Sequence, residues 1–371
     1  MPFLTDKIQS TQLEERAKRA LEAENCAPVN TKEAGKAVGL SNARFKLDLH
    51  SIEDGLRDQI IGQDNAIDVL MQHLKAICVD IGDARKPLAS ILFTGPTGVG
   101  KTEIVRLLAR GMYGDADAVC RIDMNTLAQE HYSAALTGAP PGYVGSKEGT
   151  TILDQEKIEG SRNLPGIVLF DELEKASNEV VMALLNVLDN GLLTVASGEK
   201  TISFRNAIIF MTSNLGAEQI NELRSRKSKL LDTFRRSKVG EDKRVMMECL
   251  LERFPPEFIN RIDCIETFNS IGGNQISEIL AVEVEKLNAR LVKHNYRLEL
   301  EPDVVEFLSK QGFDERFGAR ELRRTIRKHL EFPLADFLLA IIQALDDQGK
   351  PVLLLAKLDT NQIIFERKNA K

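Results

Sequence analysis

The sequence predicts an α/β protein, with a three-layer domain built on a parallel sheet and then a smaller, mainly helical α+β domain. Two observations support this prediction. Short, almost continuously apolar runs alternate with amphipathic helical stretches between residues 50 and 267, which is typical of a parallel sheet covered on both faces. After residue 268 the pattern is mainly helical and ends in two strand-like runs. At 371 residues, the chain is also too long for one small core.

Four apolar runs are expected to form the strands of the large sheet, because helical or turn-forming sequence bounds each of them. The amphipathic stretches between them would cover the sheet as helices. Ahead of this domain, residues 1–49 are polar and only partly helix-prone, and we expect a helical arm of unknown role there. The expected strands are Ser90–Thr94, Ala118–Ile122, Ile167–Phe170 and Ala207–Met211.

The second domain is predicted over residues 268–371. Gln275 to Asn295 form a long amphipathic stretch, which predicts a helix. Near the end of the chain, Val352–Leu355 and Ile363–Glu366 have the character of two strands, and Arg297–Leu300 is the candidate for a third. A small sheet covered by helices is therefore expected.

Composition disfavours several classes of protein. The net charge is −6, Trp is absent and aromatic residues make up 5%, so neither a positive field nor base-stacking side chains favour nucleic-acid binding. No apolar run approaches the ~18 residues of a membrane span, and the first residues lack the layout of a secretory signal. The five cysteines are scattered without a Cys-x-x-Cys pair, which argues against a disulfide framework or a zinc site. We expect a cytoplasmic protein without membrane contact.

One motif predicts a phosphate site. Residues 95–102 fit G-x-x-x-x-G-K-[ST] between an apolar run and a helical stretch, although a glycine-rich turn that matches by accident is the alternative. The glycines let backbone N–H groups face phosphate, and the helix N-terminus adds partial positive charge. Lys101 would reach the β- and γ-phosphates of ATP, and the Thr102 hydroxyl would bind Mg²⁺. The residues expected to contact the nucleotide are Gly95, Pro96, Thr97, Gly98, Val99, Gly100, Lys101 and Thr102.

Two further strands end in residues that hydrolysis needs. The run Gly166–Phe170 is followed by Asp171 and Glu172. An aspartate there can hold the water shell of Mg²⁺, and an adjacent glutamate can orient and deprotonate the attacking water. Asn214, beyond the last predicted strand, would position that water from the same edge of the sheet. Each residue alone would be an ordinary strand-end or turn residue, but the phosphate loop favours the hydrolytic interpretation.

Taken together, these residues resemble the Clp-type AAA+ ATPases, above all the C-terminal ATPase module of ClpB and ClpA. The resemblance extends from about Leu56 to Leu339 and rests on several motifs in the expected order. Beyond the phosphate loop and the two acids, four motifs carry the resemblance. The family's adenine-contacting segment is similar to Ile60-Ile61-Gly62-Gln63, and its substrate-gripping pore loop is similar to Gly138-Ala139-Pro140-Pro141-Gly142-Tyr143-Val144-Gly145. The segment with the arginine finger is similar to Phe258-Ile259-Asn260-Arg261-Ile262-Asp263, and the second sensor of the lid domain is similar to Gly318-Ala319-Arg320.

The resemblance implies a role for each motif. Ile60-Ile61 would contact adenine, and Arg320 would contact the same nucleotide from the lid. Arg261 would reach the γ-phosphate held by a neighbouring subunit, so that hydrolysis depends on assembly. Tyr143, with Val144 beside it, would grip an extended polypeptide.

Each of these motifs also has a plainer interpretation. Tyr143 alone would be an exposed residue of a surface turn. Arg261 could instead form an ion pair within the chain, with Asp263 or Glu266 as its partner. Arg320 could be one of several surface arginines on its helix.

Two departures from the family bear on the expected partners. ClpA and ClpB have two ATPase modules, whereas this sequence has one. Relatives that dock on the ClpP protease carry an Ile-Gly-Phe or Ile-Gly-Leu tripeptide. Here Ile-Gly occurs at Ile61, Ile81 and Ile271, followed by Gln, Asp and Gly respectively. Docking on ClpP is therefore disfavoured.

The sequence thus predicts a Mg²⁺-dependent ATPase with a large domain over residues 50–267 and a lid domain over residues 268–371. We expect a homo-oligomeric ring, a hexamer by the resemblance, that unfolds or remodels protein substrates. Two other functions stay open. One is remodelling of nucleic acid, which the negative net charge and the loop with Tyr143 disfavour. The other is a regulatory scaffold that binds nucleotide with little hydrolysis, which the presence of both Asp171 and Glu172 disfavours.

Overall fold

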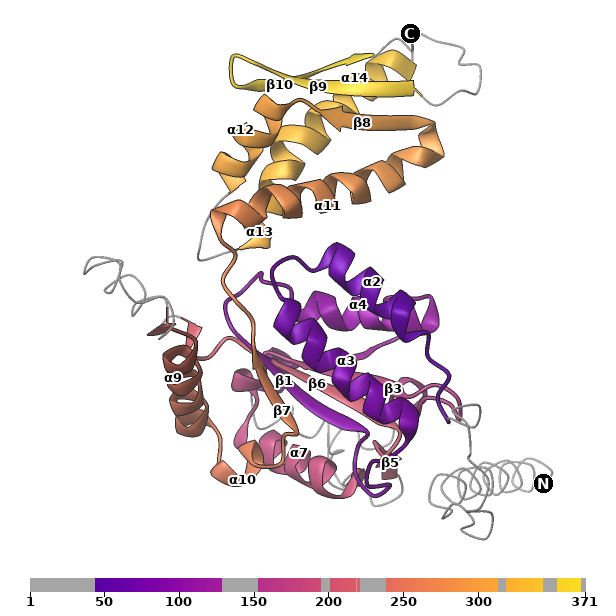
Figure 1. Cartoon of the computed structure of the whole chain (residues 1–371), viewed down its shortest axis with the longest axis vertical. Coiled ribbons are helices and arrows are strands. Elements are labelled where there is room, and N and C mark those ends of the chain that lie inside the picture. The colour runs from indigo at the N-terminus through magenta and orange to yellow at the C-terminus, as the bar shows by residue number, and fades with distance from the viewer. Residues whose placement is uncertain are drawn as a thin grey trace, which may run out of the picture. The chain divides into compact units, whose positions relative to one another are not determined.

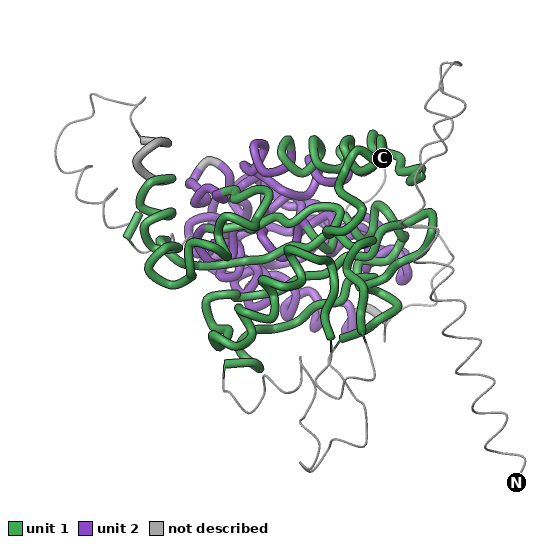
Figure 2. Tube along the Cα trace, turned by 90° about the horizontal axis from the view of Figure 1, so that it is seen from below, with its two compact units in different colours: residues 1–53, 68–94, 105–266 green, residues 54–67, 95–104, 267–371 purple. Residues whose placement is uncertain are grey.

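A computed structural model describes most of the chain, and its contacts divide the chain into two compact units (Figure 2). The described residues are 44–128, 153–194, 201–217, 219–220, 238–312, 318–342 and 352–367. The first unit, called the sheet unit below, takes its described residues from Met1–Glu53, Asp68–Thr94 and Val105–Glu266. The second, called the lid unit, takes them from Asp54–Ile67, Gly95–Ile104 and Thr267–Lys371.

The centre of the sheet unit is a five-stranded sheet in the order β2-β3-β6-β1-β7. Parallel pairing joins β2 to β3, β3 to β6 and β6 to β1. The parallel sheet predicted from the apolar runs is therefore confirmed, and it also contains β7, a short, partly buried strand that the sequence pattern does not reveal. The strands are β1 (Ala89–Thr94), β2 (Cys120–Asp123), β3 (Gly166–Asp171), β6 (Ala207–Ser213) and β7 (Cys264–Thr267).

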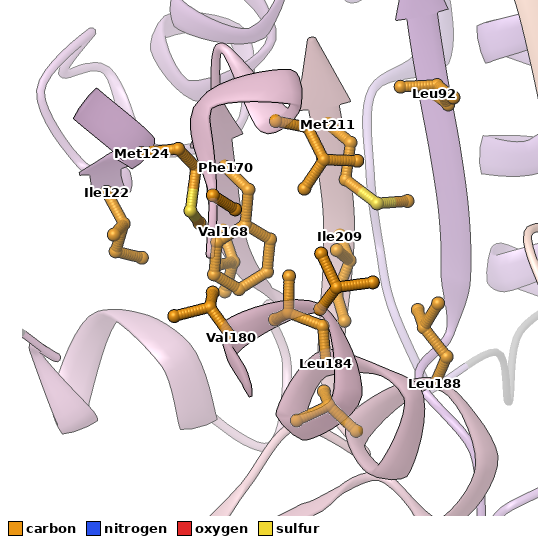
Figure 3. Packing of buried hydrophobic residues seen from close by; sticks show 14 of the residues in the cluster. Leu92, Ile122, Met124, Val168, Phe170, Val180, Leu184, Leu188, Ile209 and Met211 are labelled. Carbon is orange, nitrogen blue, oxygen red and sulfur yellow. The ribbon is translucent and has the colours of Figure 1, made fainter. Parts of the chain in front are cut away.

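Both faces of this sheet are covered, since every residue of β1, β3 and β6 is buried. Helix α7 (Asn178–Asn190) covers one face, and its residues Val180, Leu184 and Leu188 pack with Val168 and Ile209 of the sheet (Figure 3). The parts of α3 (Asp64–Val79) and α4 (Lys101–Tyr113) that belong to this unit cover the other face (Figure 1). A fully buried central sheet explains why its strands have continuous rather than alternating apolar sequences.

Shorter elements complete the sheet unit. The hairpin of β4 (Leu192–Thr194) and β5 (Thr201–Ser203) follows α7, and helix α2 (Leu49–Gln59) begins in this unit and ends in the other. The remaining described elements are η3 (Met124–Leu127), α6 (Gln155–Glu159), η4 (Leu173–Lys175), α9 (Lys238–Arg253) and α10 (Pro256–Ile259).

The lid unit contains a three-stranded sheet in the order β10-β9-β8, covered by helices. Strand β9 (Val352–Asp359) pairs parallel with β8 (Tyr296–Leu300) and antiparallel with β10 (Gln362–Arg367). This arrangement confirms the two predicted terminal strands and their predicted partner. The helical segments are α11 (Gly273–Leu291), η5 (Val292–His294), α12 (Pro302–Gly312), α13 (Ala319–Ile326), the π-helical turn η6 (Arg327–Glu331) and α14 (Phe332–Ile342). Among the described residues, no helix combines the length and the apolar character that a membrane span needs.

Leu184→Ala should lower the free energy of unfolding by about 2–5 kcal/mol, the usual cost of a cavity in a packed core. Leu184 is 2% exposed beneath the sheet, whereas Met182 on the same helix is 52% exposed. Met182→Ala is therefore the matched control and should change stability by less than about 0.5 kcal/mol. Urea unfolding followed by circular dichroism measures both variants. Equal losses would contradict the packing of α7 against the sheet.

Candidate functional site

The phosphate loop belongs to the lid unit and runs from Gly95 to Gly100, ahead of α4. Gly95, Gly98 and Gly100 have φ angles of +130°, +74° and +109°, which side chains of L-residues rarely allow. A Cβ at Gly95 would also come within 2.7 Å of the Phe268 carbonyl oxygen. The loop therefore requires these glycines for its turns and its close packing.

Lys101 begins α4, and its side chain folds back over the loop. It is 7% exposed, and Nζ donates to the carbonyl oxygens of Gly95 at 2.5 Å and Pro96 at 2.6 Å. The ammonium charge is thus held against the backbone of the loop. In this position it lies beside the turn that the sequence predicts to bind phosphate.

The segment predicted to contact adenine also packs near this loop. The Ile60 side chain lies against Gly100, 3.6 Å from where a Cβ on that glycine would be. Gln63 is 1% exposed and bonds the backbone of Asn269 twice, with Nε2 donating to O at 3.0 Å and Oε1 accepting from N at 2.8 Å. Ile61 is partly exposed. The structure thus brings Ile60 to the beginning of α4, and the adenine contact itself stays a prediction.

The first turn of α13 touches the phosphate loop within the lid unit. The Ala319 N–H donates to the Gly98 carbonyl oxygen at 3.1 Å. Gly318 has φ +54°, and a Cβ there would lie 3.0 Å from Gly98 O and 3.1 Å from Thr97 O. Only glycine fits so close to the loop in this conformation. Arg320, the predicted second sensor, is the next residue along this helix and is exposed.

A cluster of four charged side chains joins the same helices, and the sequence analysis did not predict it. Nζ of Lys286 in α11 lies 3.4 Å from Oε1 of Glu103 in α4 and 3.3 Å from Oε1 of Glu283. Nη2 of Arg323 in α13 lies 2.9 Å from Oε1 of Glu283 and 3.8 Å from Oε1 of Glu103. Burial alone would raise the pKa of Glu283, but the hydrogen bond and charge of Arg323, together with Lys286, lower it overall. We call these residues the α4–α11–α13 ion cluster.

In the sheet unit, Asp171 ends β3 with both carboxylate oxygens bonded. Oδ1 accepts from the Thr212 hydroxyl at 2.5 Å. Oδ2 accepts from Arg121 Nη2 at 2.6 Å and Nε at 3.1 Å. Asp171 is 6% exposed, and the strands on either side of β3 supply these two partners. A carboxylate at the end of a strand is a ligand of the kind that Mg²⁺ takes directly or through its waters, so the donor chemistry fits this cation.

Glu172 follows in a left-handed backbone conformation, with φ +59° and ψ +53°. This conformation is uncommon for a residue other than glycine and costs about 1–3 kcal/mol. The Glu172 N–H donates to Thr212 Oγ1 at 3.0 Å, and Oε2 accepts from Asn125 Nδ2 at 2.6 Å. Asn125 is itself held by Asp123, whose Oδ1 accepts from both its N–H and its side-chain amide at 2.9 Å. The carboxylate of Glu172 is therefore held by a side chain of η3, which follows β2, and its backbone N–H by a side chain of β6.

Asn214 follows β6, and its N–H donates to Glu174 Oε1 at 3.1 Å. The structure thus brings together the acidic pair Asp171 and Glu172, which the sequence predicts at the end of one strand, and Asn214, which it predicts beyond another. It adds Arg121, Asn125, Thr212 and Glu174, which the sequence analysis did not single out. Asn125 and Thr212 lie close to the ends of predicted strands, so the rule that led to Asn214 could also have found them.

Arg261 follows α10 and forms an ion pair within the sheet unit. Its Nε lies 2.9 Å from Asp189 Oδ1 of α7. The partners considered from the sequence were wrong, because Asp263 instead accepts from the N–H of Ser90 at 2.8 Å and its hydroxyl at 2.7 Å. The role of Arg261 across a subunit interface stays a prediction.

The predicted pore loop is not part of the described structure. Tyr143 and Val144 lie between residues 129 and 152, outside the described residues. Their predicted contact with substrate therefore rests on the sequence.

Two family models match the chain. A model described as AAA domain (Cdc48 subfamily) matches residues 86–265. A model of the C-terminal, D2-small domain of ClpB protein matches residues 271–348. The first match covers most of the sheet unit with the phosphate loop, and the second covers most of the lid helices.

Several curated relatives are similar over most of this chain. One is the ATP-dependent protease ATP-binding subunit-like protein AmiB of Pseudomonas aeruginosa, 50% identical over 99% of this chain and 100% of that protein. An ATP-dependent protease ATP-binding subunit-like protein of Rhodococcus erythropolis is 39% identical over 98% of each chain. The chaperone protein ClpB of Vibrio vulnificus is 38% identical, over 85% of this chain but only 35% of ClpB.

Among solved structures, the Hsp104:casein complex of S. cerevisiae in its extended conformation is similar, with a TM-score of 0.71 at 29% identity. The match covers 88% of this chain and 53% of that chain. The chain therefore spans the length of the two subunit-like relatives, but about a third of ClpB and half of the Hsp104 chain. With the phosphate loop, the acidic strand end and the lid in the expected order, the chain belongs to the Clp-type AAA+ ATPases and resembles the second ATPase module of ClpB.

Proposed function

We propose that this AAA+ ATPase uses the hydrolysis of ATP to unfold or remodel protein substrates, as a homo-oligomeric ring that we expect to be a hexamer. The hydrolytic part is supported most directly by the carboxylate of Glu172, which accepts a hydrogen bond from Asn125 while the backbone of Glu172 bonds Thr212. A carboxylate with a fixed direction suits a general base, because its oxygen is aimed before the attacking water arrives.

In this proposal the phosphate loop and the beginning of α4 bind the triphosphate of ATP. Backbone N–H groups in glycine turns and at a helix N-terminus bind anions, and Lys101 adds a positive charge for the β- and γ-phosphates. The Thr102 hydroxyl and the Asp171 carboxylate are proposed to hold Mg²⁺. When bound, the metal ion neutralises charge on the phosphate oxygens. Arg121 and Thr212 fix the orientation of the Asp171 carboxylate through their hydrogen bonds.

The proton of the attacking water is proposed to pass to Glu172. Asn214 would hold the same water through its side-chain amide, because it follows β6 at the edge of the sheet where β3 also ends. Arg261 is proposed to supply positive charge to the γ-phosphate bound by a neighbouring subunit. Its pairing with Asp189 fixes the Nε side of the guanidinium within its own subunit.

The lid is proposed to sense the nucleotide through Arg320. This proposal is supported by the contacts of Gly318 and Ala319 with the phosphate loop, because these residues lie two and one positions ahead of Arg320. Ile60 and Ile61 are proposed to contact adenine, and the packing of Ile60 against Gly100 supports this assignment.

Protein is the proposed substrate, gripped by Tyr143 and Val144. The relatives support this class, because one is named a chaperone and a similar structure is titled a complex of Hsp104 with casein. An amphipathic ring provides contact area without sequence-specific hydrogen bonds, which suits varied polypeptides. Docking on ClpP is not proposed, since Ile-Gly is nowhere followed by Phe or Leu. We propose the cytoplasm as the site of action.

Glu172→Gln should reduce the turnover of ATP by at least about a hundredfold while ATP still binds, because the amide cannot accept the proton of the attacking water. Lys101→Ala should instead weaken binding, since it removes the positive charge of the loop. Steady-state hydrolysis and the dissociation constant of a fluorescent ATP analogue separate the two effects. Normal turnover by the Glu172→Gln protein would show that another group is the base.

Gly318→Ala should weaken the binding of ATP by about tenfold or more. The added Cβ would meet carbonyl oxygens of the phosphate loop, at a φ that costs a non-glycine residue about 1–3 kcal/mol. Gly272→Ala is the control, because its φ is −89° and a Cβ there meets no atom within 4 Å. Titration with the same fluorescent analogue measures both. Unchanged affinity in the Gly318 variant would mean that α13 does not constrain the loop.

Tyr143→Ala should leave basal hydrolysis intact but abolish its stimulation by an unfolded protein such as casein. The predicted reason is that Tyr143 supplies contact with the polypeptide and takes no part in binding phosphate. ATPase rates with and without casein, for both proteins in parallel, give the result. Single-stranded DNA serves as the control ligand and should stimulate neither protein. Equal stimulation by casein would refute the gripping role and leave the client class open.

A further inference from the structure

Glu174 lies two residues after the proposed base, in the short turn η4, and its carboxylate reaches β6. Oε1 accepts the N–H of Asn214 at 3.1 Å. The paired register of β6 with β1 ends at Ser213, and Asn214 is the first residue beyond it. Just beyond this strand pairing, the carboxylate of Glu174 holds the backbone N–H of Asn214.

The turn that carries Glu174 is itself held from a third element. Arg253, the last residue of α9, donates through Nε to the Glu174 carbonyl oxygen at 3.0 Å, and Nη2 donates to the Ala176 carbonyl oxygen. Nη1 also donates to Asn178 Oδ1 at 3.3 Å. With its own backbone held in this way, Glu174 is a fixed support and not a mobile surface acid.

The second carboxylate oxygen of Glu174 is placed at a cost in stability. Oε2 is buried and has no hydrogen-bond partner in the described part of the chain. A buried acceptor without a donor is costly to keep, and such groups in native structures call for an explanation. The bond of Oε1 to Asn214 supplies one, because it joins the turn of the base to the residue proposed to hold the water.

We propose that Glu174 is a positioning residue that sets the place of Asn214 relative to Glu172. This inference rests on the proposed role of Asn214 in hydrolysis. Without the bond to Oε1, the N–H of Asn214 would lose this link to η4, and the Asn214 side-chain amide would shift. A misplacement of about 1 Å is enough to cost up to ~100-fold in rate. Binding of ATP should be spared, because Glu174 is not among the residues proposed to contact the nucleotide.

The test compares Glu174→Ala with Glu159→Ala in the full-length protein. Glu159 is a matched control, since its Oε1 also accepts a main-chain N–H in the sheet unit, that of Ser203 at 3.2 Å. It belongs to α6, which precedes β3, and has no proposed role in hydrolysis. Glu174→Ala should lower kcat by about tenfold or more with the dissociation constant of ATP changed less than about twofold. Glu159→Ala should leave both nearly unchanged.

Two conservative variants distinguish positioning from simple support of the fold. Glu174→Gln retains an acceptor at Oε1 and should keep at least about half of the wild-type kcat. Glu174→Asp retains the charge but is one methylene shorter and should lose kcat as the alanine variant does. Because Glu174→Asp keeps a polar group in the turn, it tests the proposal even if the alanine variant fails to fold. Full activity of the aspartate variant would overturn the proposal.

A double-mutant cycle with Asn214→Ala tests whether Glu174 acts through Asn214. If it does, the double variant should be no slower than Asn214→Ala alone. Multiplied losses would overturn the inference. A normal kcat for Asn214→Ala would instead refute the proposed role of Asn214, so the two failures are distinguishable.

Hydrogen exchange of the nucleotide-free protein gives a readout independent of hydrolysis. A peptide that contains Asn214 should exchange faster in Glu174→Ala and at the wild-type rate in Glu159→Ala. Unchanged exchange in both variants would show that the bond from Glu174 does not restrain this backbone, and would overturn the proposal.

Discussion

The hydroxyl of Thr212 bonds both acidic residues at the end of β3, and the geometry of the acidic edge depends on it. It donates to the carboxylate of Asp171 and accepts the N–H of Glu172. A hydroxyl can do both at once because it has one proton and two lone pairs. The parallel register places Met211 opposite Phe170, so Thr212 arrives where β3 ends. A slip of one residue in that register would turn the hydroxyl to the other face of the sheet.

In the lid unit, different interactions hold the elements around the phosphate loop in place. There, charges and glycines replace the strand register: the α4–α11–α13 ion cluster joins three helices, and Gly318 lets α13 approach the loop closely. Ion pairs that are partly exposed contribute little stability each, so the four side chains matter here as a network that links α4, α11 and α13. The phosphate loop is thus packed by its own lid helices as well as by the chain on either side of it.

The parts of the fold and site that follow from sequence are those with a local pattern. Continuous apolar runs predict β1, β3 and β6 because those strands are buried on both faces. The phosphate motif is one contiguous stretch of sequence, and Asp171 and Glu172 at the end of β3 are neighbours in sequence. Strand β7 and the partners Arg121 and Asp189 have no such pattern, since each depends on which distant segment packs beside it. The pairing of Arg261 was wrong for this reason, because nearby acids in sequence are not its neighbours in space.

The left-handed backbone of Glu172 has a consequence for how the protein can be altered. Glycine adopts this conformation without strain, whereas Glu172 holds it at a cost in free energy. Replacing Glu172 with glycine would relieve that strain and raise the stability of the fold, but it would also remove the carboxylate proposed as the base. Stability and turnover are therefore opposed at this one position. Replacing strained residues with glycine to raise thermal tolerance would therefore remove the proposed base at this position. At Thr360 and Asn361 the positive φ angles close the hairpin of β9 and β10, so the same replacement there would leave the acidic edge as it is.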